Sequence, residues 1–348
     1  MKTLRTPMRP ARRRLYNGPA APSRSLTQAQ RFSCLVAVSA AILAAGCSGP
    51  TSGLAPTGRA PGVGPVSLFE RSRSRAAKAG LYVGEFYGST VYGFRRSGKG
   101  PAVCAITGVS SVNDLASDAK GDVIEPDGGG RELRVFGPHC GAVLGAVPDP
   151  YGQPADAVSA NAASDTIAIA NIFGPQRTNG SISLCSLKGG CTQNLTNPNM
   201  YEVVGVAMSQ GGDCWASAED ANGHANLTYF KGCKGHGETA KGFINPAFGG
   251  LDFDAAGNLL SFSGASAQLY VYSGCSPRCK LAGGPFSMAG TSVYGHLNKR
   301  RDMLAVADYQ HGQIDLYSYT PTVVNYVGSF NTGLSQSLDV VGVTYATD

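Results

Sequence analysis

The sequence lacks the short motifs of several common catalytic centres. Its five histidines form no H-E-x-x-H or H-x-H pair, and no G-x-S-x-G segment is present. Neither a zinc protease of the H-E-x-x-H type nor a serine hydrolase of the α/β type is therefore supported. Helical periodicity is also missing beyond residue 80, and tryptophan occurs once, as Trp215. We expect this part of the chain to consist of strands.

Positive charge is scarce after the N-terminal region. Residues 1–47 hold 8 of the 29 basic side chains and none of the 23 acidic ones, so the chain from Ser48 onward is net −2. Residues 81–348 hold 16 basic and 22 acidic side chains, which gives a net charge of −6. Nucleic-acid binding needs a basic surface. We therefore expect no nucleic-acid partner.

One turn pattern recurs five times, at intervals of 43 to 48 residues. In each copy Asp, Asn or Ser opens the turn and Asp or Asn follows four residues later. One copy lies in DFDAAGN (252–258) and could start a calcium loop, but Ser263 stands where such a loop needs a glutamate. The pattern indicates a repeated hairpin turn instead. The five pairs are Asp118 and Asp122, Asn161 and Asp165, Ser209 and Asp213, Asp254 and Asn258, and Asn298 and Asp302.

Short apolar segments on both sides of these turns predict strands. VVGVAM precedes one turn, and CWASA and NLTYF follow it. Four short antiparallel strands per 40 to 50 residues are typical of a β-propeller blade. Near the C-terminus, residues 340–343 repeat the VVGV of 203–206, yet no further strand follows. We predict an all-β, six-bladed β-propeller over residues 79–348, in which the C-terminal strand completes the first blade and leaves no open edge.

Three segments carry a resemblance to a known superfamily. LYVGEFYGSTVYGF, GNLLSFSGASAQLYVY and MLAVADYQHGQIDLY resemble the six-bladed propellers of the NHL-repeat and gluconolactonase-like superfamily, over roughly residues 79–348. The hairpins YFKGCKG and YVYSGCSPRC are similar to those of uncharacterised bacterial lipoprotein propellers. The resemblance implies the fold and leaves the function open, because propellers include lactonases, lyases and binding modules.

The N-terminal region has the order of a bacterial export signal. A basic start is followed by the apolar stretch 33–46, which is too short to span a bilayer, and residues 1–46 are predicted to be a signal peptide. The ending Ala-Ala-Gly-Cys resembles a lipobox, which implies lipidation of Cys47. Residues 47–78 are rich in Gly, Pro, Ser and Arg and predict a disordered linker. We expect a protein anchored by lipid in the bacterial cell envelope, outside the cytoplasm. The alternative is a transmembrane stub or an ordinary signal peptide.

Eight cysteines follow Cys47, and their positions predict four disulfides. Two pairs flank hairpins, a third closes the ends of two antiparallel strands, and the fourth follows by elimination. Zinc binding by the C-x3-C segment is an alternative, although no second pair of thiols has a matching spacing. Disulfides indicate an oxidising compartment. The predicted pairs are Cys185 with Cys191, Cys275 with Cys279, Cys214 with Cys233, and Cys104 with Cys140.

Candidate ligand-binding residues come from equivalent positions of the repeats. Six residues after a closing turn residue lie Asn171, Glu219 and Asp308, and Glu85 matches them in the first blade. The resemblance to gluconolactonases implies that these four could form a metal site, although the Glu-Gly-Pro-x-Trp motif of that family is absent. Alternatively, each side chain caps its own loop. The candidate ligand-binding residues are Glu85, Asn171, Glu219, Asp308, Tyr309 and His311.

Aromatic and histidine side chains also fall near these loops. A rim of tyrosines could stack on a sugar or a peptide, or the same tyrosines could be half-buried packing residues. The tyrosines are Tyr87, Tyr151, Tyr201, Tyr294 and Tyr309. Three histidines could approach the same face, although solvated surface histidine is the favoured interpretation for each, and these are His224, His296 and His311.

The sequence thus predicts a non-catalytic binding module without a cofactor. Its membrane partner is reached through the lipid anchor, and its ligand is a small molecule, a glycan or a protein. The alternative is a lactonase or hydrolase of the gluconolactonase type, which depends on a divalent cation.

Overall fold

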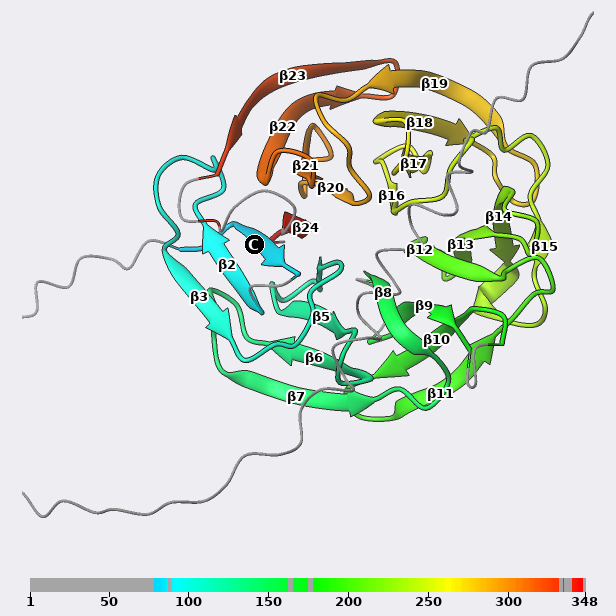
Figure 1. Cartoon of the computed structure of the whole chain (residues 1–348), viewed down its shortest axis with the longest axis horizontal. Helices are drawn as coiled ribbons and strands as arrows, with labels where there is room; N and C mark the ends of the chain where they lie inside the picture. The colour runs from blue at the N-terminus through cyan, green and yellow to red at the C-terminus, as the bar shows by residue number, and fades with distance from the viewer. Residues whose placement is uncertain are drawn as a thin grey trace, which may run out of the picture. The chain divides into compact units, whose positions relative to one another are not determined.

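The computed structural model of the protein describes residues 78–86, 89–161, 165–174, 178–331, 334 and 340–346. Within these ranges, six four-stranded antiparallel sheets stand around one axis as the blades of a propeller (Figure 1). No helix in the described ranges is long and apolar enough to cross a membrane. The signal peptide, Cys47 and the linker up to residue 77 lie outside the described residues.

In blades 2 to 6 the chain starts at the innermost strand and runs outward, whereas the innermost strand of blade 1 is the C-terminal strand of the chain. Blade 1 consists of β24 (Val340–Tyr345), β1 (Leu81–Glu85), β2 (Thr90–Phe94) and β3 (Cys104–Thr107). Blade 2 consists of β4 (Ala116–Ser117), β5 (Val123–Asp127), β6 (Glu132–Phe136) and β7 (Val143–Pro148). Blade 3 consists of β8 (Gln153–Ala160), β9 (Ile167–Phe173), β10 (Ser181–Ser186) and β11 (Gly190–Leu195). Blade 4 consists of β12 (Glu202–Met208), β13 (Cys214–Glu219), β14 (Ala225–Phe230) and β15 (Glu238–Thr239). Blade 5 consists of β16 (Leu251–Phe253), β17 (Leu259–Ser263), β18 (Gln268–Ser273) and β19 (Lys280–Ser287). Blade 6 consists of β20 (Gly295–Leu297), β21 (Met303–Asp308), β22 (Gln313–Thr320) and β23 (Val323–Phe330). A short 3-10 helix, η3 (Lys231–Cys233), follows β14.

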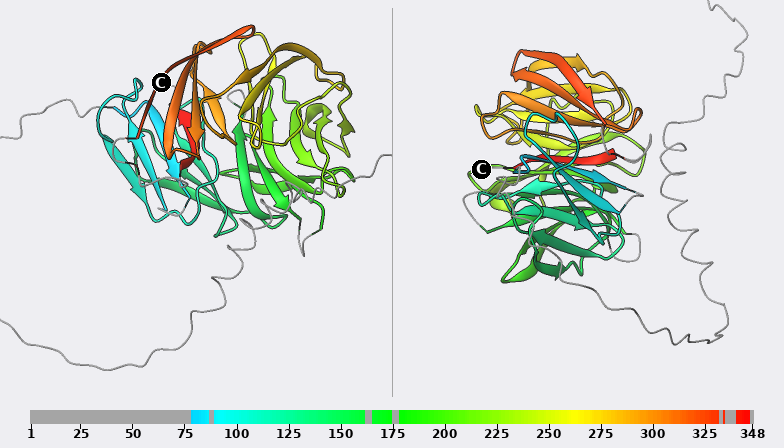
Figure 2. Two further views of the ribbon diagram at one scale, coloured as in Figure 1. Left: turned by 45° about the horizontal axis from the view of Figure 1, so that its top comes forward. Right: turned by 90° about the vertical axis from the view of Figure 1, so that its left-hand side faces the viewer.

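The C-terminal strand closes the ring. Strand β24 pairs antiparallel with β1, from Leu81 opposite Tyr345 to Glu85 opposite Val340. Both views of Figure 2 show β24, in red, beside the cyan strands of blade 1. The pairing gives blade 1 its fourth strand from the C-terminal segment, and the predicted composite blade is confirmed.

The middle strands are buried on both faces because each blade packs against two neighbours. Strands β1, β5 and β17 are buried along their whole length, which explains why runs such as LLSFS do not alternate strictly. The outermost strands β7 and β23 alternate or are largely exposed. Six clusters of buried side chains result, each between two adjacent blades.

The repeated turns are held as their composition predicts. In blade 2 the Asp118 carboxylate accepts hydrogen bonds from the backbone N–H groups of Lys120 and Asp122, at 2.8 and 3.0 Å. In blade 5 Asp254 accepts from Ala256 and Asn258 at 2.9 and 2.8 Å. The opening residue therefore forms the turn with its own backbone, and no metal ion is needed to explain its conservation of type among the repeats.

The four predicted disulfides are all present. Cys185–Cys191 and Cys275–Cys279 each close a hairpin between the third and fourth strands of a blade, and Cys214–Cys233 links strand β13 to η3. Cys104–Cys140 joins the outer strand of blade 1 to the β6–β7 turn of blade 2. Four disulfides point to an oxidising environment outside the cytoplasm.

Candidate functional site

The four polar residues predicted from the repeat occupy matching places on four blades. Glu85, Glu219 and Asp308 end the second strands β1, β13 and β21, and Asn171 lies near the end of β9. Because these strands are equivalent, their ends lie on one face of the ring, which we call the loop face. Glu85 is 1% exposed, and Asn171 and Asp308 are fully buried. They are therefore parts of the framework beneath the loops.

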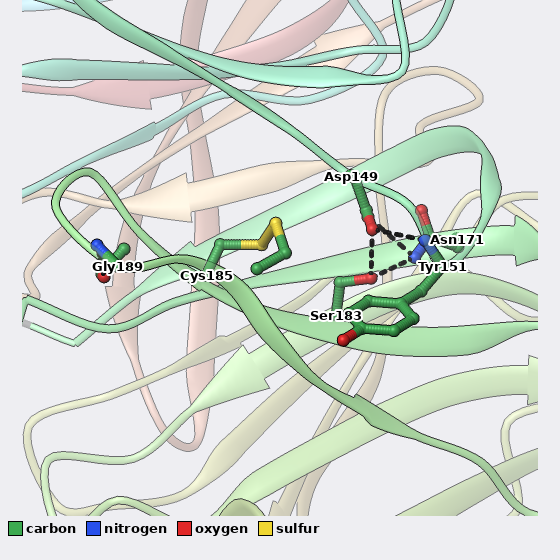
Figure 3. Close-up of a disulfide and its surroundings, with 8 residues drawn as sticks. Asp149, Tyr151, Asn171, Ser183, Cys185 and Gly189 are labelled. Carbon is green, nitrogen blue, oxygen red and sulfur yellow. Dashed lines mark hydrogen bonds between the residues drawn. A yellow bond between two sulfur atoms is a disulfide. The ribbon is translucent and has the colours of Figure 1, made fainter.

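Asn171 is the centre of a small polar cluster within blade 3 (Figure 3). Its Nδ2 donates to Asp149 Oδ2 at 3.1 Å and to Ser183 Oγ at 2.7 Å, and Ser183 donates to Asp149 Oδ1 at 2.9 Å. Asp149 also accepts from the backbone N–H of Tyr151 at 2.9 Å. The cluster ties the crossing from blade 2 to the middle of blade 3.

Asp308 is joined to its own loop in blade 6. Its carboxylate accepts from the backbone N–H of His311 at 3.1 Å and lies 2.6 Å from His311 Nδ1. Gln313 Nε2 also donates to it at 3.3 Å. On the next strand, burial and the nearby Asp308 carboxylate raise the pKa of Asp315 to about 6. Tyr309 follows Asp308 directly in the sequence and donates its backbone N–H to the Thr291 carbonyl at 3.1 Å.

Glu85 and Glu219 influence groups within their own blades. Burial, followed by the Glu85 carboxylate, raises the pKa of Tyr92 on the neighbouring strand β2. Burial and then the carboxylate of Glu202, on the paired strand β12, raise the pKa of Glu219. In the described residues, no three His, Cys, Asp or Glu side chains are grouped so that they could hold a metal ion. The structure thus brings together the blade 6 members of the predicted set and leaves Glu85, Asn171 and Glu219 on separate blades.

Blade 2 carries a capping carboxylate that the repeat spacing missed by one residue. Asp127 ends β5, and its carboxylate accepts from the backbone N–H groups of Gly129 and Gly130 at 3.0 and 2.7 Å. It also forms an ion pair with Arg134 at 2.9 Å. Counting from Asp122 reaches Gly128 instead, because β5 is one residue shorter than β13 and β21.

A polar network that the sequence did not reveal lies around the axis. Its members come from the inner strands, from the residues just before them and, for Arg301, from the β20–β21 turn, and Figure 1 shows the inner strands around the centre. We call it the axial network. Its members are Asp114, Asp156, Asp252, Tyr294, His296 and Arg301.

One half of the axial network links blades 3, 4 and 6. The Tyr294 hydroxyl contacts the Asp156 carboxylate and donates to the Val204 carbonyl at 3.0 Å. Burial raises the pKa of Asp156 to about 7 and outweighs the contact with the Tyr294 hydroxyl, which alone would lower it. Tyr294 is only 2% exposed. Of the two interpretations of Tyr294, the packing one holds and the stacking rim does not, since the side chain is buried among inner strands.

The other half links blades 2, 5 and 6 by charge. His296 Nε2 lies 3.3 Å from Asp114 Oδ1, and its Nδ1 lies 3.7 Å from Asp252 Oδ2. Burial opposes protonation, but these two carboxylates outweigh it and raise the pKa of His296 to about 10. Arg301 and then His296 outweigh the burial of Asp252 and hold its pKa below the ordinary range. His296, whose side chain is 14% exposed, is thus a largely enclosed cation that joins three blades near the axis.

Comparisons with known proteins identify the fold only. No protein-family model matches the chain, and no curated protein matches it. A chain of the nidogen/laminin complex is similar in structure, with a TM-score of 0.54 and 15% identity, over 77% of this chain and 98% of that one. A protein of unknown function from Bacteroides caccae gives a TM-score of 0.56 and 11% identity, over 78% and 100%. One from Desulfotomaculum acetoxidans gives 0.54 and 14%, over 76% and 84%.

Proposed function

We propose that the protein is a lipid-anchored, extracytoplasmic β-propeller that binds a ligand or a protein partner and does not catalyse a reaction. The observation that carries the proposal is the bonding of the loop-face polar groups. Asn171 is bonded within the Asp149 and Ser183 cluster, and Asp308 is bonded to His311 and Gln313. Side chains used in this way hold loops in fixed positions, which suits a recognition surface.

Two further points support the proposal. Four disulfides fit a protein that works in an oxidising compartment. A propeller of similar fold occurs in the nidogen/laminin complex, an assembly of two proteins. Membership in the NHL and gluconolactonase-like superfamily, and in the group of bacterial lipoprotein propellers, forms part of the same proposal and stands on the sequence resemblance.

Metal titration separates the binding module from a metal-dependent hydrolase. We expect the metal-stripped full chain to give no saturable heat with calcium, zinc or manganese, and its melting midpoint to stay constant at millimolar metal. The Glu85→Gln, Asp308→Asn double variant should lose about 1–3 kcal/mol per site from altered hydrogen bonds, equally with and without metal. A ligand held only by the folded state raises the midpoint.

The opposite result identifies the hydrolase. In that case the wild-type midpoint climbs with one of the metals and the double variant loses the climb. Asp220→Asn is the control, because Asp220 lies in the β13–β14 turn and accepts hydrogen bonds there from the backbone of Asn222 and His224. A metal-dependent rise that survives in the control and vanishes in the double variant would overturn the proposed function.

The anchor is tested at Cys47. We expect Cys47→Ser to move the protein from the membrane fraction to the soluble fraction, because the acyl chains would be attached to this thiol. Cys34→Ser is the matched control, since Cys34 lies inside the apolar stretch and should not affect attachment. Fractionation after a high-salt wash measures the outcome, and Cys47→Ser protein that stays with the membranes rules out the lipid anchor.

A further inference from the structure

A groove between blades 3 and 4 has the size of a small-ligand site. It has a volume of about 540 Å³ and lies where the two residues Thr178 and Asn179 ahead of β10, the crossing from β11 to β12 and the loop before β15 meet. Small-ligand sites commonly have volumes of roughly 300–1,000 Å³. We call it the amide groove, and its lining residues are Thr178, Asn179, Thr196, Asn197, Pro198 and His236.

Hydrogen bonds between the blades fix the walls of the amide groove. Asn197 Nδ2 donates to the His236 carbonyl at 2.8 Å, and its Oδ1 accepts from the Asn199 backbone at 2.9 Å. Asn179 Nδ2 donates to the Pro198 carbonyl at 3.2 Å. Asn197 is only 9% exposed and is committed to these bonds. The groove is therefore a preformed shape held by both blades.

The wall presents polar groups that have no partner within the described residues. These are Asn179 Oδ1, the Thr196 hydroxyl and the His236 ring nitrogens. Together they can both donate and accept hydrogen bonds, as the hydroxyl groups of a ligand also do. None of the six lining residues carries a fixed charge. A ligand that is neutral and rich in hydroxyl groups matches this lining.

An exposed tyrosine is joined through its backbone to the segment that forms one wall of the groove. Tyr201 is 39% exposed, and its carbonyl accepts from the backbone of Gly180, the residue that follows Asn179. Its ring is supported edge-on by Phe173, with ring centroids 6.1 Å apart. A supported tyrosine offers an apolar face and a polar tip at little cost in side-chain entropy. Sugar rings have the complementary construction, with C–H groups on the faces and hydroxyl groups at the edges.

We propose that the amide groove binds a neutral saccharide, with Asn179, Thr196 and His236 bonding its hydroxyl groups and Tyr201 stacking on a sugar ring. This names a ligand class for the binding module and so rests on the proposed function. A peptide fits less well, because peptide recognition uses an open sheet edge or pockets for apolar side chains. Pro198 supplies the only apolar side chain among the six lining residues.

Ligand-observed NMR and calorimetry on the full chain test the proposal. The probes are cellobiose, maltose, lactose and N,N′-diacetylchitobiose, with galacturonate and an alanine–glycine pentapeptide for comparison. We expect at least one neutral disaccharide to bind, and Asn179→Ala and Tyr201→Ala each to weaken its affinity by about tenfold through a lost hydrogen bond or stacking contact. Asn325→Ala and Tyr326→Ala are matched controls on strand β23, where Tyr326 is 52% exposed, and they should leave the affinity unchanged.

Each other outcome overturns the saccharide proposal. If no neutral sugar binds, or if binding is insensitive to Asn179→Ala and Tyr201→Ala, the groove is not a saccharide site. If only the pentapeptide binds and the two variants weaken it, the groove is a peptide site and the binding-module function stands. The metal titration described above tests the proposed function independently of the saccharide proposal, since it needs no sugar.

Discussion

Replacing Gly205 with alanine should destabilise the propeller by roughly 3 kcal/mol or more, which is at or above the usual cost of overpacking a core. Gly205 lies in β12, the innermost strand of blade 4. A Cβ atom at this position would lie 2.2 Å from the Gly249 carbonyl oxygen and 3.0 Å from Ser217 Cβ. The first contact is with backbone, so no rotamer change can relieve it.

The partner of Gly205 is itself confined. A Cβ on Gly249 would lie 2.4 Å from the Phe262 carbonyl oxygen, and the Gly249 N–H donates to Ser217 Oγ at 3.2 Å. Relief of the clash at Gly205 therefore requires blade 5 to move away from blade 4. Because the ring is closed, such a movement disturbs the other interfaces as well, and the loss of stability should be cooperative.

Two further glycines calibrate the measurement by chemical or thermal denaturation. Gly342 is the matching residue of the second VVGV segment, but its added Cβ would lie 3.1 Å from Asp114 backbone, so Gly342→Ala should cost less than Gly205→Ala. Gly211 is exposed, and its nearest neighbour would be Ser209 Oγ at 3.6 Å, so Gly211→Ala should be neutral or slightly stabilising. Equal midpoints for the three variants would show that the close approach of blades 4 and 5 does not limit stability.

The fold could be predicted from the sequence because its repeated features are local in the chain. The turns depend on local bonds, such as Asp254 to its own backbone, and they recur with the blade, so their spacing counts the blades. Disulfides within a hairpin, such as Cys185–Cys191, follow from the same local geometry. Ring closure by β24 also followed, because a matching inner strand lacked a blade of its own.

The axial network was not predictable because it joins residues by three-dimensional position. Tyr294 contacts Asp156 across 138 residues, and His296 meets Asp114 across 182. Blades 2, 3 and 5 contribute one polar side chain each and blade 6 contributes three, without a shared spacing from the turns. The amide groove could not be predicted for the same reason, since its asparagines come from segments that meet only after blades 3 and 4 pack.

Asp252→Asn in the axial network should lower the free energy of unfolding by roughly 2–4 kcal/mol near pH 6. This loss overlaps the lower part of the range of about 3–5 kcal/mol for breaking a fully buried ion pair. The Asp252 side chain is 13% exposed and Arg301 is 34% exposed, so water compensates part of the loss. Asp252 also bonds the Leu297 backbone N–H at 2.8 Å, a bond that an asparagine oxygen can keep. The variant therefore mainly removes the negative charge that faces Arg301 and His296.

The dependence of this effect on pH has a definite sign. The lowered pKa of Asp252 means that its contribution is present above about pH 4, the ordinary carboxyl range, and is lost as the pH falls further. The raised pKa of His296, about 10, means that its contribution is complete below about pH 6.5 and is lost as the pH rises through 10. The difference between wild type and variant should therefore be largest between about pH 4 and 6.5, the window that these two groups share. Asp156 acts in the opposite sense to Asp252. Because its pKa is raised to about 7, the free energy of unfolding falls as the pH rises from about 4 to 7.

A surface pair separates this effect from a general effect of removing one carboxylate. Asp220 lies 3.3 Å from His224, whose side chain is 76% exposed, so Asp220→Asn should change stability by about 0.5 kcal/mol or less at every pH. Melting midpoints of the wild type and both variants, measured from pH 4 to 10, give the comparison. A loss at Asp252 that matches the loss at Asp220, or that does not shrink as the pH approaches 10, would show that the buried His296 cation does not hold the blades together. The expected result is a deficit confined to Asp252→Asn that shrinks as His296 deprotonates and keeps the part due to Arg301, which stays charged at pH 10.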